Sequence, residues 1–337
     1  MMKQLPDSAV TLLWVVFGFV VVGGLTALTG SRMVADIIIH VSILGLFAVS
    51  LNILVGYTGL VSFGHAMFFA SGAYGFGLMM QSGGFSIPFA LVLSMLISAA
   101  ISLVVGYICL KTREIYFAFL TLAIQMLFYS SLLSWVDLTG GDQGLTGGFD
   151  KPAFMGIDLG NQNHLFLFIL FVSIVSLGVL WHITKTPFGY TLRMIRDNAT
   201  RVEAFGLNVN RYRLAAFVIA SSAASVAGAL MCVYVSAAYP NFGYWTMSGE
   251  AIFMIMLGGL NSFLGPLVGA AILTLLNHWI TAYTELYGLV LGTIILIYVL
   301  VLRQGLLDMV LGKWRVRQSR LRTSELPISA VKSETYK

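Results

Sequence analysis

The chain is dominated by a succession of apolar runs, most of them close to twenty residues long. A run of that length spans a bilayer as a helix, because a helix satisfies its own backbone hydrogen bonds where water is absent. The runs lie at about 10–29, 34–55, 61–80, 86–110, 115–136, 164–183, 213–238, 248–259, 266–282 and 285–302. With the shorter runs counted as crossings, they predict an all-α integral membrane protein, a polytopic bundle of about ten helices.

The charge content supports a membrane protein. Only 10% of the 337 residues are charged, whereas roughly a quarter are charged in soluble proteins. The formal net charge of +5 comes from the stretch after Leu302, which holds eight basic and three acidic residues. Such a tail is typical of a cytoplasmic anchor, so no nucleic-acid partner is predicted. Cys109 and Cys232 lie inside apolar runs, and they predict neither a disulfide framework nor a metal site.

Basic residues predict the orientation of the bundle. With the N-terminus inside, Lys111, Arg113, the central loop and the tail fall in the cytoplasm. Only Arg32 does not fit this orientation. The loop 137–163 falls outside, with four aspartates against one lysine. The predicted parts are a membrane half (1–183) with that external loop (137–163), a cytoplasmic coupling loop (184–212), a second membrane half (213–302) and a basic tail (303–337).

Five crossings on each side of the external loop would give the halves opposite orientations, as in inverted repeats. An internal similarity points the same way. Residues 54–64 read LVGYTGLVSFG and residues 257–265 read LGGLNSFLG, each a glycine-broken apolar stretch. The pattern is compatible with two inverted five-helix halves that carry broken helices, and interrupted helices in two halves point to a translocation pathway.

The charged stretch 184–213 separates two membrane blocks. Within it, residues 190–205 are predicted to form an amphipathic helix, with Pro187 suited to the first turn and Gly206 to the end. Its apolar stripe consists of Leu192, Ile195, Val202 and Phe205. We expect the stripe to fill a groove; the alternative is a helix that lies on anionic lipid.

Several polar side chains occur within apolar runs, where each costs several kcal/mol unless it finds a partner or water. They and the glycines beside them are the candidate substrate-pathway residues: Asn52, Gly56, Gly59, Ser62, Gly64, His65, Gln125, Glu250 and Asn261. For His65, a pathway role and a structural hydrogen bond both remain open. Gln125 is also explained by a contact between helices, and Glu250 by a solvated acid beside interfacial aromatic residues.

The chain carries no recognisable catalytic motif. It lacks a nucleophile elbow, an HExxH sequence and paired carboxylates, so no catalytic residue, metal ligand or cofactor is predicted. The glycine-rich run 139–148 lacks the lysine and hydroxyl of a phosphate-binding loop, and no Walker motif occurs elsewhere. If ATP drives this protein, a separate subunit must hydrolyse it.

Three regions, in order along the chain, resemble one known family. They are residues 52–74, residues 112–123 with 139–148, and residues 186–230 with 257–270. Together they cover about 35–305, and they resemble the membrane-spanning permease subunits of bacterial ABC importers for branched-chain amino acids, with the related urea and amide importers.

The resemblance implies a heteromeric importer in the bacterial inner (plasma) membrane, with both termini cytoplasmic. Its partners would be cytoplasmic ATP-binding cassette subunits, a second permease (a paralogue or the same chain), a periplasmic solute-binding protein and membrane lipid. The helix 190–206 would couple the permease to an ATPase by packing its apolar stripe in a groove, with its charged residues at the rim. The residues assigned to this coupling are Tyr190, Arg193, Arg196, Asp197, Asn198, Glu203 and Gly206.

The chain departs from the family pattern at Tyr190, where a basic residue is usual, and at 200–202, where an acidic-aliphatic-alanine run is usual. These changes bear on the choice of ATPase and leave the solute class open. Two alternatives therefore stand beside an amino-acid importer. One is a urea or amide permease, and the other is a stand-alone channel or secondary transporter for a small polar solute.

Overall fold

The computed structural model describes residues 32–112, 114–146, 159–283, 286–301 and 305–309. Its elements are α2 (Arg32–Asn52), the π-helical turn η1 (Ile53–Thr58), α3 (Ala66–Gln81), α4 (Ile87–Cys109), α5 (Glu114–Ser134), α6 (Val136–Thr139), η2 (Gly141–Gln143), α7 (Gln162–Lys185), α8 (Pro187–Ala204), α9 (Val209–Val235), η3 (Pro240–Gly243), α10 (Trp245–Gly258), α11 (Gly265–Tyr283) and α12 (Tyr287–Val301). Within these ranges there is no strand, only one isolated bridge between Leu145 and Ala238. The all-α prediction is confirmed for this part of the chain; the run at 10–29 and most of the tail lie outside it.

Six helical stretches within the described ranges are long and apolar enough to cross a membrane. They are Arg32–Thr58, Ile87–Cys109, Ile115–Ser134, Gln162–Lys185, Val209–Val235 and Gly265–Tyr283. The other predicted crossings correspond to α3, α10 and α12, which have 16, 14 and 15 residues, fewer than the roughly 20 of a typical span. The protein is thus a multi-pass helical membrane protein, and the number of about ten crossings stays a prediction.

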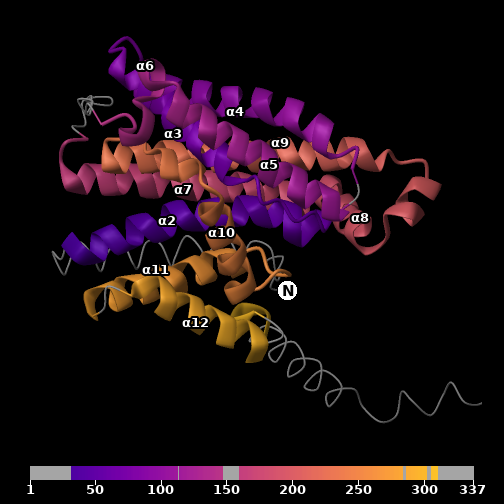
Figure 1. Ribbon diagram of the computed structural model, residues 1–337. Coiled ribbons are helices and arrows are strands. Elements are labelled where there is room, and N and C mark those ends of the chain that lie inside the picture. The colour runs from indigo at the N-terminus through magenta and orange to yellow at the C-terminus, as the bar shows by residue number, and fades with distance from the viewer. Residues whose placement is uncertain (1–31, 113, 147–158, 284–285, 302–304, 310–337) are drawn as a thin grey trace, which may run out of the picture.

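The long helices lie side by side, with α6 at one end of the bundle and α8 at the other (Figure 1). α9 packs against α2, α3 and α4, and α11 packs against α2 and α10. The spans α2–η1 and α9 are the most buried of the six, whereas α5 is the least buried. Large apolar side chains on α4, α5 and α7, such as Val104, Phe119 and Phe171, are exposed, as expected for surfaces that face lipid.

Small residues allow α9 to occupy the middle of the bundle. A Cβ added to Gly72 of α3 would lie 2.0 Å from Ser225 O, and one added to Gly228 of α9 would lie 1.8 Å from Phe69 O. Ser225 also donates a hydrogen bond from Oγ to Ser94 O of α4, at 3.1 Å. The α3–α9 backbones therefore touch, which is how helices associate where lipid removes the hydrophobic driving force.

Candidate functional site

Two helix breaks lie at the end of the bundle that carries α8. In the first, α2 passes into η1, which ends at Gly59 with a φ of 76°, and α3 does not begin until Ala66. In the second, α10 ends at Gly258, Gly259 has a φ of 125°, and α11 begins at Gly265. Both left-handed positions favour glycine, which explains why the two stretches carry it.

The two breaks touch each other. A Cβ added to Gly56 would lie 2.6 Å from Leu260 O and would overlap the side chain of Asn52, so only glycine allows this approach. The stretches 54–64 and 257–265 are thus neighbours at one end of the bundle. Two inverted five-helix halves stay a prediction.

Arg196 of α8 links the two breaks. Its Nη1 donates hydrogen bonds to Gly56 O in the first break and to Asn261 Oδ1 in the second, the latter at 3.4 Å. A Cβ added to Gly59 would lie 3.2 Å from Arg196 Cγ, so the arginine stem rests on that turn. One turn earlier, the Arg193 guanidinium lies over the Tyr57 ring, 4.6 Å from its centroid, which is a cation–π contact.

The second break is also tied to the segment that follows α12. Asp308 accepts hydrogen bonds from Asn261 N and Nδ2, at 3.0 and 3.2 Å, and from Ser262 Oγ at 2.8 Å. Arg196, Asn261 and Asp308 therefore form one polar network across three parts of the chain. In the sequence, Asp308 is simply an acidic residue of a basic tail, and no local pattern predicts its partners.

The apolar stripe of α8 is covered by other parts of the same chain. This corrects the sequence prediction that the stripe packs in a groove of an ATPase subunit. Leu192, Ile195 and Val202 are buried within this chain, the last two beside Val209 of α9. The groove that they fill is intramolecular because α8 folds back onto neighbouring elements of the same chain. Of the predicted stripe, only Phe205 is exposed, with 79% of its surface accessible.

A different apolar set on α8 faces outward. Tyr190 and Met194, one helical turn apart, are exposed together with Phe205. Asp197 is exposed too, and with Tyr190 and Met194 it follows three- and four-residue steps on the part of α8 before Asn198. Arg201 and Phe205 are exposed beyond the interruption at Asn198. The sequence prediction included Tyr190 but missed Met194, because amphipathic spacing alone does not say which of two apolar faces is covered.

The ends of α8 agree with the sequence prediction, but its middle does not. Pro187 occupies the first turn and Gly206, with a φ of 81°, ends the helix. Asn198 interrupts it with extended backbone angles, and its Oδ1 accepts a hydrogen bond from Arg201 N, as in an N-cap. Asp197 pairs with Arg196 Nε at 3.5 Å, and Glu203 is exposed.

His65, at the end of the first break, belongs to a buried polar cluster. His65 Nε2 lies 2.8 Å from Ser50 Oγ of α2, and its ring stacks on Phe47. The next residue, Ala66, donates from its backbone to Ser248 Oγ, which in turn donates to Gln125 Oε1, at 2.8 and 2.9 Å. Four helices, α2, α3, α5 and α10, are joined in this way.

This cluster has unused hydrogen-bonding capacity. The amide oxygen and nitrogen of Asn52, His65 Nδ1 and Gln125 Nε2 are buried and make no hydrogen bond within the described part of the chain. Unpaired buried polar groups are costly and rare, so each calls for a functional or structural explanation.

The remaining pathway candidates are placed differently. Ser62 is buried and its Oγ accepts from Gly64 N at 3.3 Å, which is a local turn contact. A Cβ added to Gly64 would lie 2.6 Å from Thr121 O, so this glycine brings the turn against α5. Glu250 is exposed on α10 and does not join the cluster. Sequence reasoning missed Ser50 and Ser248, since isolated serines in apolar helices give no pattern.

Comparison with known proteins identifies the class of protein that carries this arrangement. Residues 33–300 match the family model described as branched-chain amino acid transport system, permease component. The chain belongs to this permease family.

Relatives of this permease include the high-affinity branched-chain amino acid transport system permease proteins LivM of Salmonella typhimurium and Escherichia coli. Each is 26% identical over 302 residues, which cover 83% of this chain and 71% of the relative. The probable LivH permease of Methanocaldococcus jannaschii is 25% identical, covering 81% of this chain and 91% of the relative. No solved structure matches this permease. The relatives are transport permeases and not enzymes.

Proposed function

We propose that this permease is the transmembrane subunit of an ATP-driven importer that carries branched-chain or other small amino acids across the bacterial inner membrane. The observation that carries the proposal is the attachment of α8 to both helix breaks through Arg196. A helix fastened in this way can transmit movement from a partner into the bundle. The family match and the names of the relatives supply the solute class. Separate subunits hydrolyse ATP, since the sequence has no Walker motif.

In this proposal α8 lies in the cytoplasm and seats its exposed apolar residues Tyr190 and Met194, with Phe205 just after its end, in an ATP-binding subunit. The bundle crosses the membrane about ten times, with both termini cytoplasmic, and its halves form two inverted repeats of five helices each. A second permease, a periplasmic solute-binding protein and membrane lipid complete the assembly. The presence of both LivM-like and LivH-like relatives supports pairing with a paralogue.

The coupling path runs from α8 to the buried cluster. Movement of α8 acts on η1 through the Arg193–Tyr57 and Arg196–Gly56 contacts. η1 continues directly from Asn52, whose unpaired amide lies beside Gly56. ATP binding by the partner would in this way bias the helix breaks between two arrangements, which is energetic coupling between two sites.

The solute pathway is assigned to Asn52, His65 and Gln125, whose free polar groups would replace part of the hydration of an amino acid. All three side chains are buried, so in this proposal the path must open for a solute to pass. Asn261 and the glycines at 56, 59 and 64 shape the breaks instead of lining the polar cluster.

The docking face is tested with Met194→Glu in the importer complex purified from its native membrane. A carboxylate forced into an apolar contact is costly, so recovery of the ATP-binding subunits and ATP-driven leucine uptake should both fall about tenfold or more. Asn210→Glu, which adds the same charge at an exposed position on α9, should leave both unchanged.

Native uptake and partner recovery by Met194→Glu would refute docking through this face. If the permease alone carried leucine into liposomes without ATP, the channel or secondary-transporter alternative would replace the importer.

A further inference from the structure

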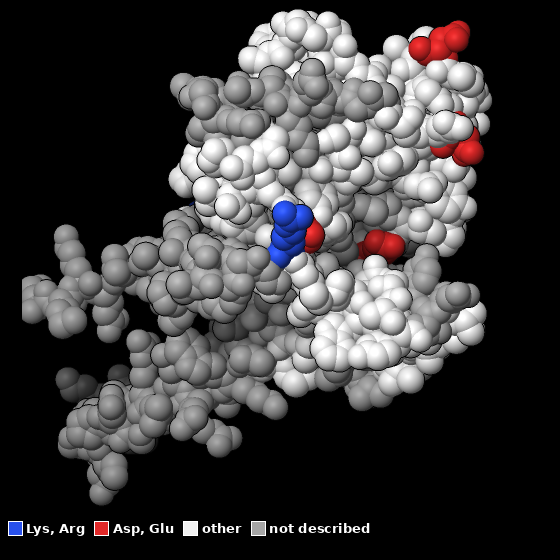
Figure 2. Space-filling model, turned by 90° about the vertical axis from the view of Figure 1, so that its left-hand side faces the viewer, with Lys and Arg blue, Asp and Glu red and all other residues white. Residues whose placement is uncertain are grey.

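A second polar site lies at the end of the bundle far from α8. It is a half-open pocket of about 580 Å³ between the beginning of α2 and the last turns of α9 and α11. α9 starts beside α8 and has 27 residues, so Tyr234 near its end is roughly 40 Å away along the helix. Figure 2 looks onto this end of the molecule, where charged side chains are sparse and acidic ones cover more of the described surface than basic ones.

One side of the pocket is built around Asp36 of α2. Its Oδ1 accepts a hydrogen bond from Tyr234 OH at 3.0 Å, whereas its Oδ2 makes none within the described residues. His40, one turn further on, donates from Nδ1 to Asp36 O at 3.0 Å and packs edge-on against the Tyr234 ring. In this tautomer His40 Nε2 is an acceptor. Two acceptors, Asp36 Oδ2 and His40 Nε2, are therefore available to a donor such as an ammonium group.

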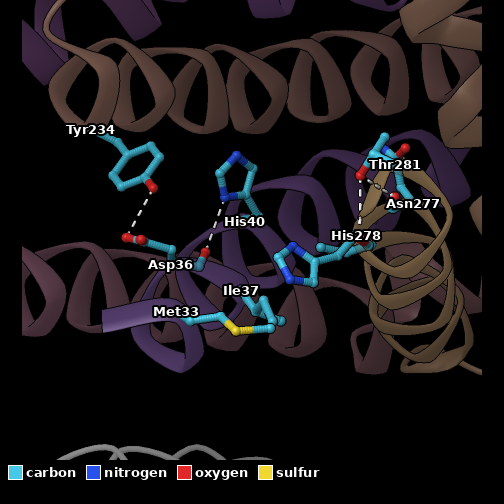
Figure 3. A pocket seen from close by; sticks show the side chains of 9 residues that line it. Met33, Asp36, Ile37, His40, Tyr234, Asn277, His278 and Thr281 are labelled. Carbon is cyan, nitrogen blue, oxygen red and sulfur yellow. Dashed lines mark hydrogen bonds between the residues drawn. The ribbon is translucent and has the colours of Figure 1, made fainter. Parts of the chain in front are cut away.

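The facing side comes from α11. Asn277 and His278 are exposed and line the pocket, and in Figure 3 the His278 side chain from α11 points toward His40 and Ile37 of α2. On the same helix, Thr274 also lines the pocket, and its Oγ1 is buried without a hydrogen-bond partner in the described chain. The Asn277 amide and the Thr274 hydroxyl can donate to an anionic group. Met33 and Ile37 add an apolar wall.

So many polar groups on three apolar membrane helices need an explanation. Asp36 is the sole carboxylate of α2, and Asn277 and His278 interrupt an otherwise apolar helix. In contact with lipid these groups would be costly, and ionisable residues in such positions usually mark a wet cavity or a solute path. The size of the pocket lies within the range of small-molecule sites.

We propose that this pocket binds a zwitterionic amino acid with an aliphatic side chain before it enters the closed path. The ammonium would meet Asp36 and His40, the carboxylate would meet Asn277 and Thr274, and the aliphatic chain would lie against Met33 and Ile37. The inference rests on the proposed function, and it places the first binding position of the solute on the side opposite α8.

The test measures equilibrium binding of radiolabelled leucine to the importer complex in phosphatidylglycerol nanodiscs, without the solute-binding protein. The variant is Asp36→Asn, which keeps an acceptor for Tyr234 but removes the charge. Leucine binding should weaken about tenfold or more, because a charged contact is lost. Asp137→Asn, which removes an exposed acid on α6 at the same end of the bundle, should bind leucine like the native complex.

A competitor separates recognition from structural damage. Isocaproate has the carboxylate and side chain of leucine without the ammonium, so it should compete weakly in the native complex. In Asp36→Asn, the ratio of isocaproate to leucine affinity should approach one, which misfolding would not produce.

Native leucine affinity in Asp36→Asn, or equal weakening in Asp137→Asn, would overturn the inference. So would saturation of the native pocket by added phosphatidylethanolamine, whose headgroup also carries an ammonium, with no binding of leucine. If leucine uptake by the native importer is ATP-driven and Asp36→Asn leaves both uptake and binding unchanged, only the pocket assignment fails. If the native importer takes up no amino acid, the proposed function fails and the inference fails with it.

Discussion

At the scale of single residues, Arg196 determines how α8 is joined to the bundle. From its sequence position it was expected at the rim of an ATPase groove, yet its guanidinium points to Gly56 O and Asn261 Oδ1 of the same chain. Charge-assisted hydrogen bonds of this kind are stronger than neutral ones and hold a fixed direction. Arg196 is therefore assigned a positioning role between α8 and the helix breaks, distinct from docking.

Arg196→Gln should uncouple the importer without dismantling it. Glutamine is too short to reach both acceptors and carries no charge, so α8 would lose its hold on η1. We expect the ATP-binding subunits to co-purify as before, while leucine transported per ATP hydrolysed falls about tenfold, as expected from the loss of about 1.5–3 kcal/mol per charged hydrogen bond. Uptake and ATPase activity measured together in proteoliposomes would show this.

The matched control is Arg201→Gln. Arg201 is exposed on α8 and takes part in the local cap only through its backbone nitrogen. If both variants transported the same amount of leucine per ATP hydrolysed, Arg196 would have no particular role in coupling. If Arg196→Gln lost the ATP-binding subunits, Arg196 would instead be part of the docking surface.

At the scale of helices, the bundle depends on the close crossing of α3 and α9. Gly72 and Gly228 remove the side chains that would separate the two backbones. The serines at 94, 98, 221 and 225 hold α4 to α9, with Ser98 Oγ donating to Ser221 O and Ser225 Oγ to Ser94 O. Because lipid is as apolar as a leucine side chain, such contacts and not hydrophobic burial determine which helices meet.

Gly228→Val should destabilise the permease. The first added carbon would already lie 1.8 Å from Phe69 O, a backbone atom that can move only if α3 and α9 separate. Overpacking of this kind costs about 1–3 kcal/mol or more, so the melting temperature in detergent should fall by several degrees. Gly178→Val on α7, where an added Cβ meets nothing within 4 Å, should melt like the native permease; equal losses in both variants would argue against the crossing.

At the scale of the whole molecule, the two ends of the bundle have different chemistry. One end carries α8, both helix breaks and the Asp308 network. The other carries α6, the bridge between Leu145 and Ala238, and the Asp36 pocket. The proposed importer, which would receive solute at one side and contact ATP-binding subunits at the other, would use this difference between the two ends.

Labelling of single cysteines tests the proposed orientation. Cys109 and Cys232 are buried, so a membrane-impermeant maleimide should leave the native chain unlabelled. In spheroplasts, Asp142→Cys should react from outside, and Lys185→Cys should react only after permeabilisation, since both positions are exposed at opposite ends of the bundle. The reverse pattern would invert the orientation and remove α8 from the cytoplasm.

Much of this architecture was predictable from sequence, because the signals are local. Apolar runs predicted the helices as far as they are described, and Pro187 and Gly206 predicted where α8 begins and ends. Glycines marked both breaks, since left-handed angles at Gly59 and Gly259 favour that residue. Such features depend on a few neighbouring residues and on the dimensions of a bilayer.

Tertiary structure alone decided which face of α8 is covered, where Arg196 points and how the two breaks lie. The partners of Arg196 are 140 and 65 residues away along the chain, and Asp308 is 47 residues from Asn261. An amphipathic pattern states that a stripe must be buried, but not whether the same chain or a partner buries it. Only the packing of distant helices supplies that answer, because the burial and the hydrogen bonds of a residue depend on which distant segments of the chain pack against it.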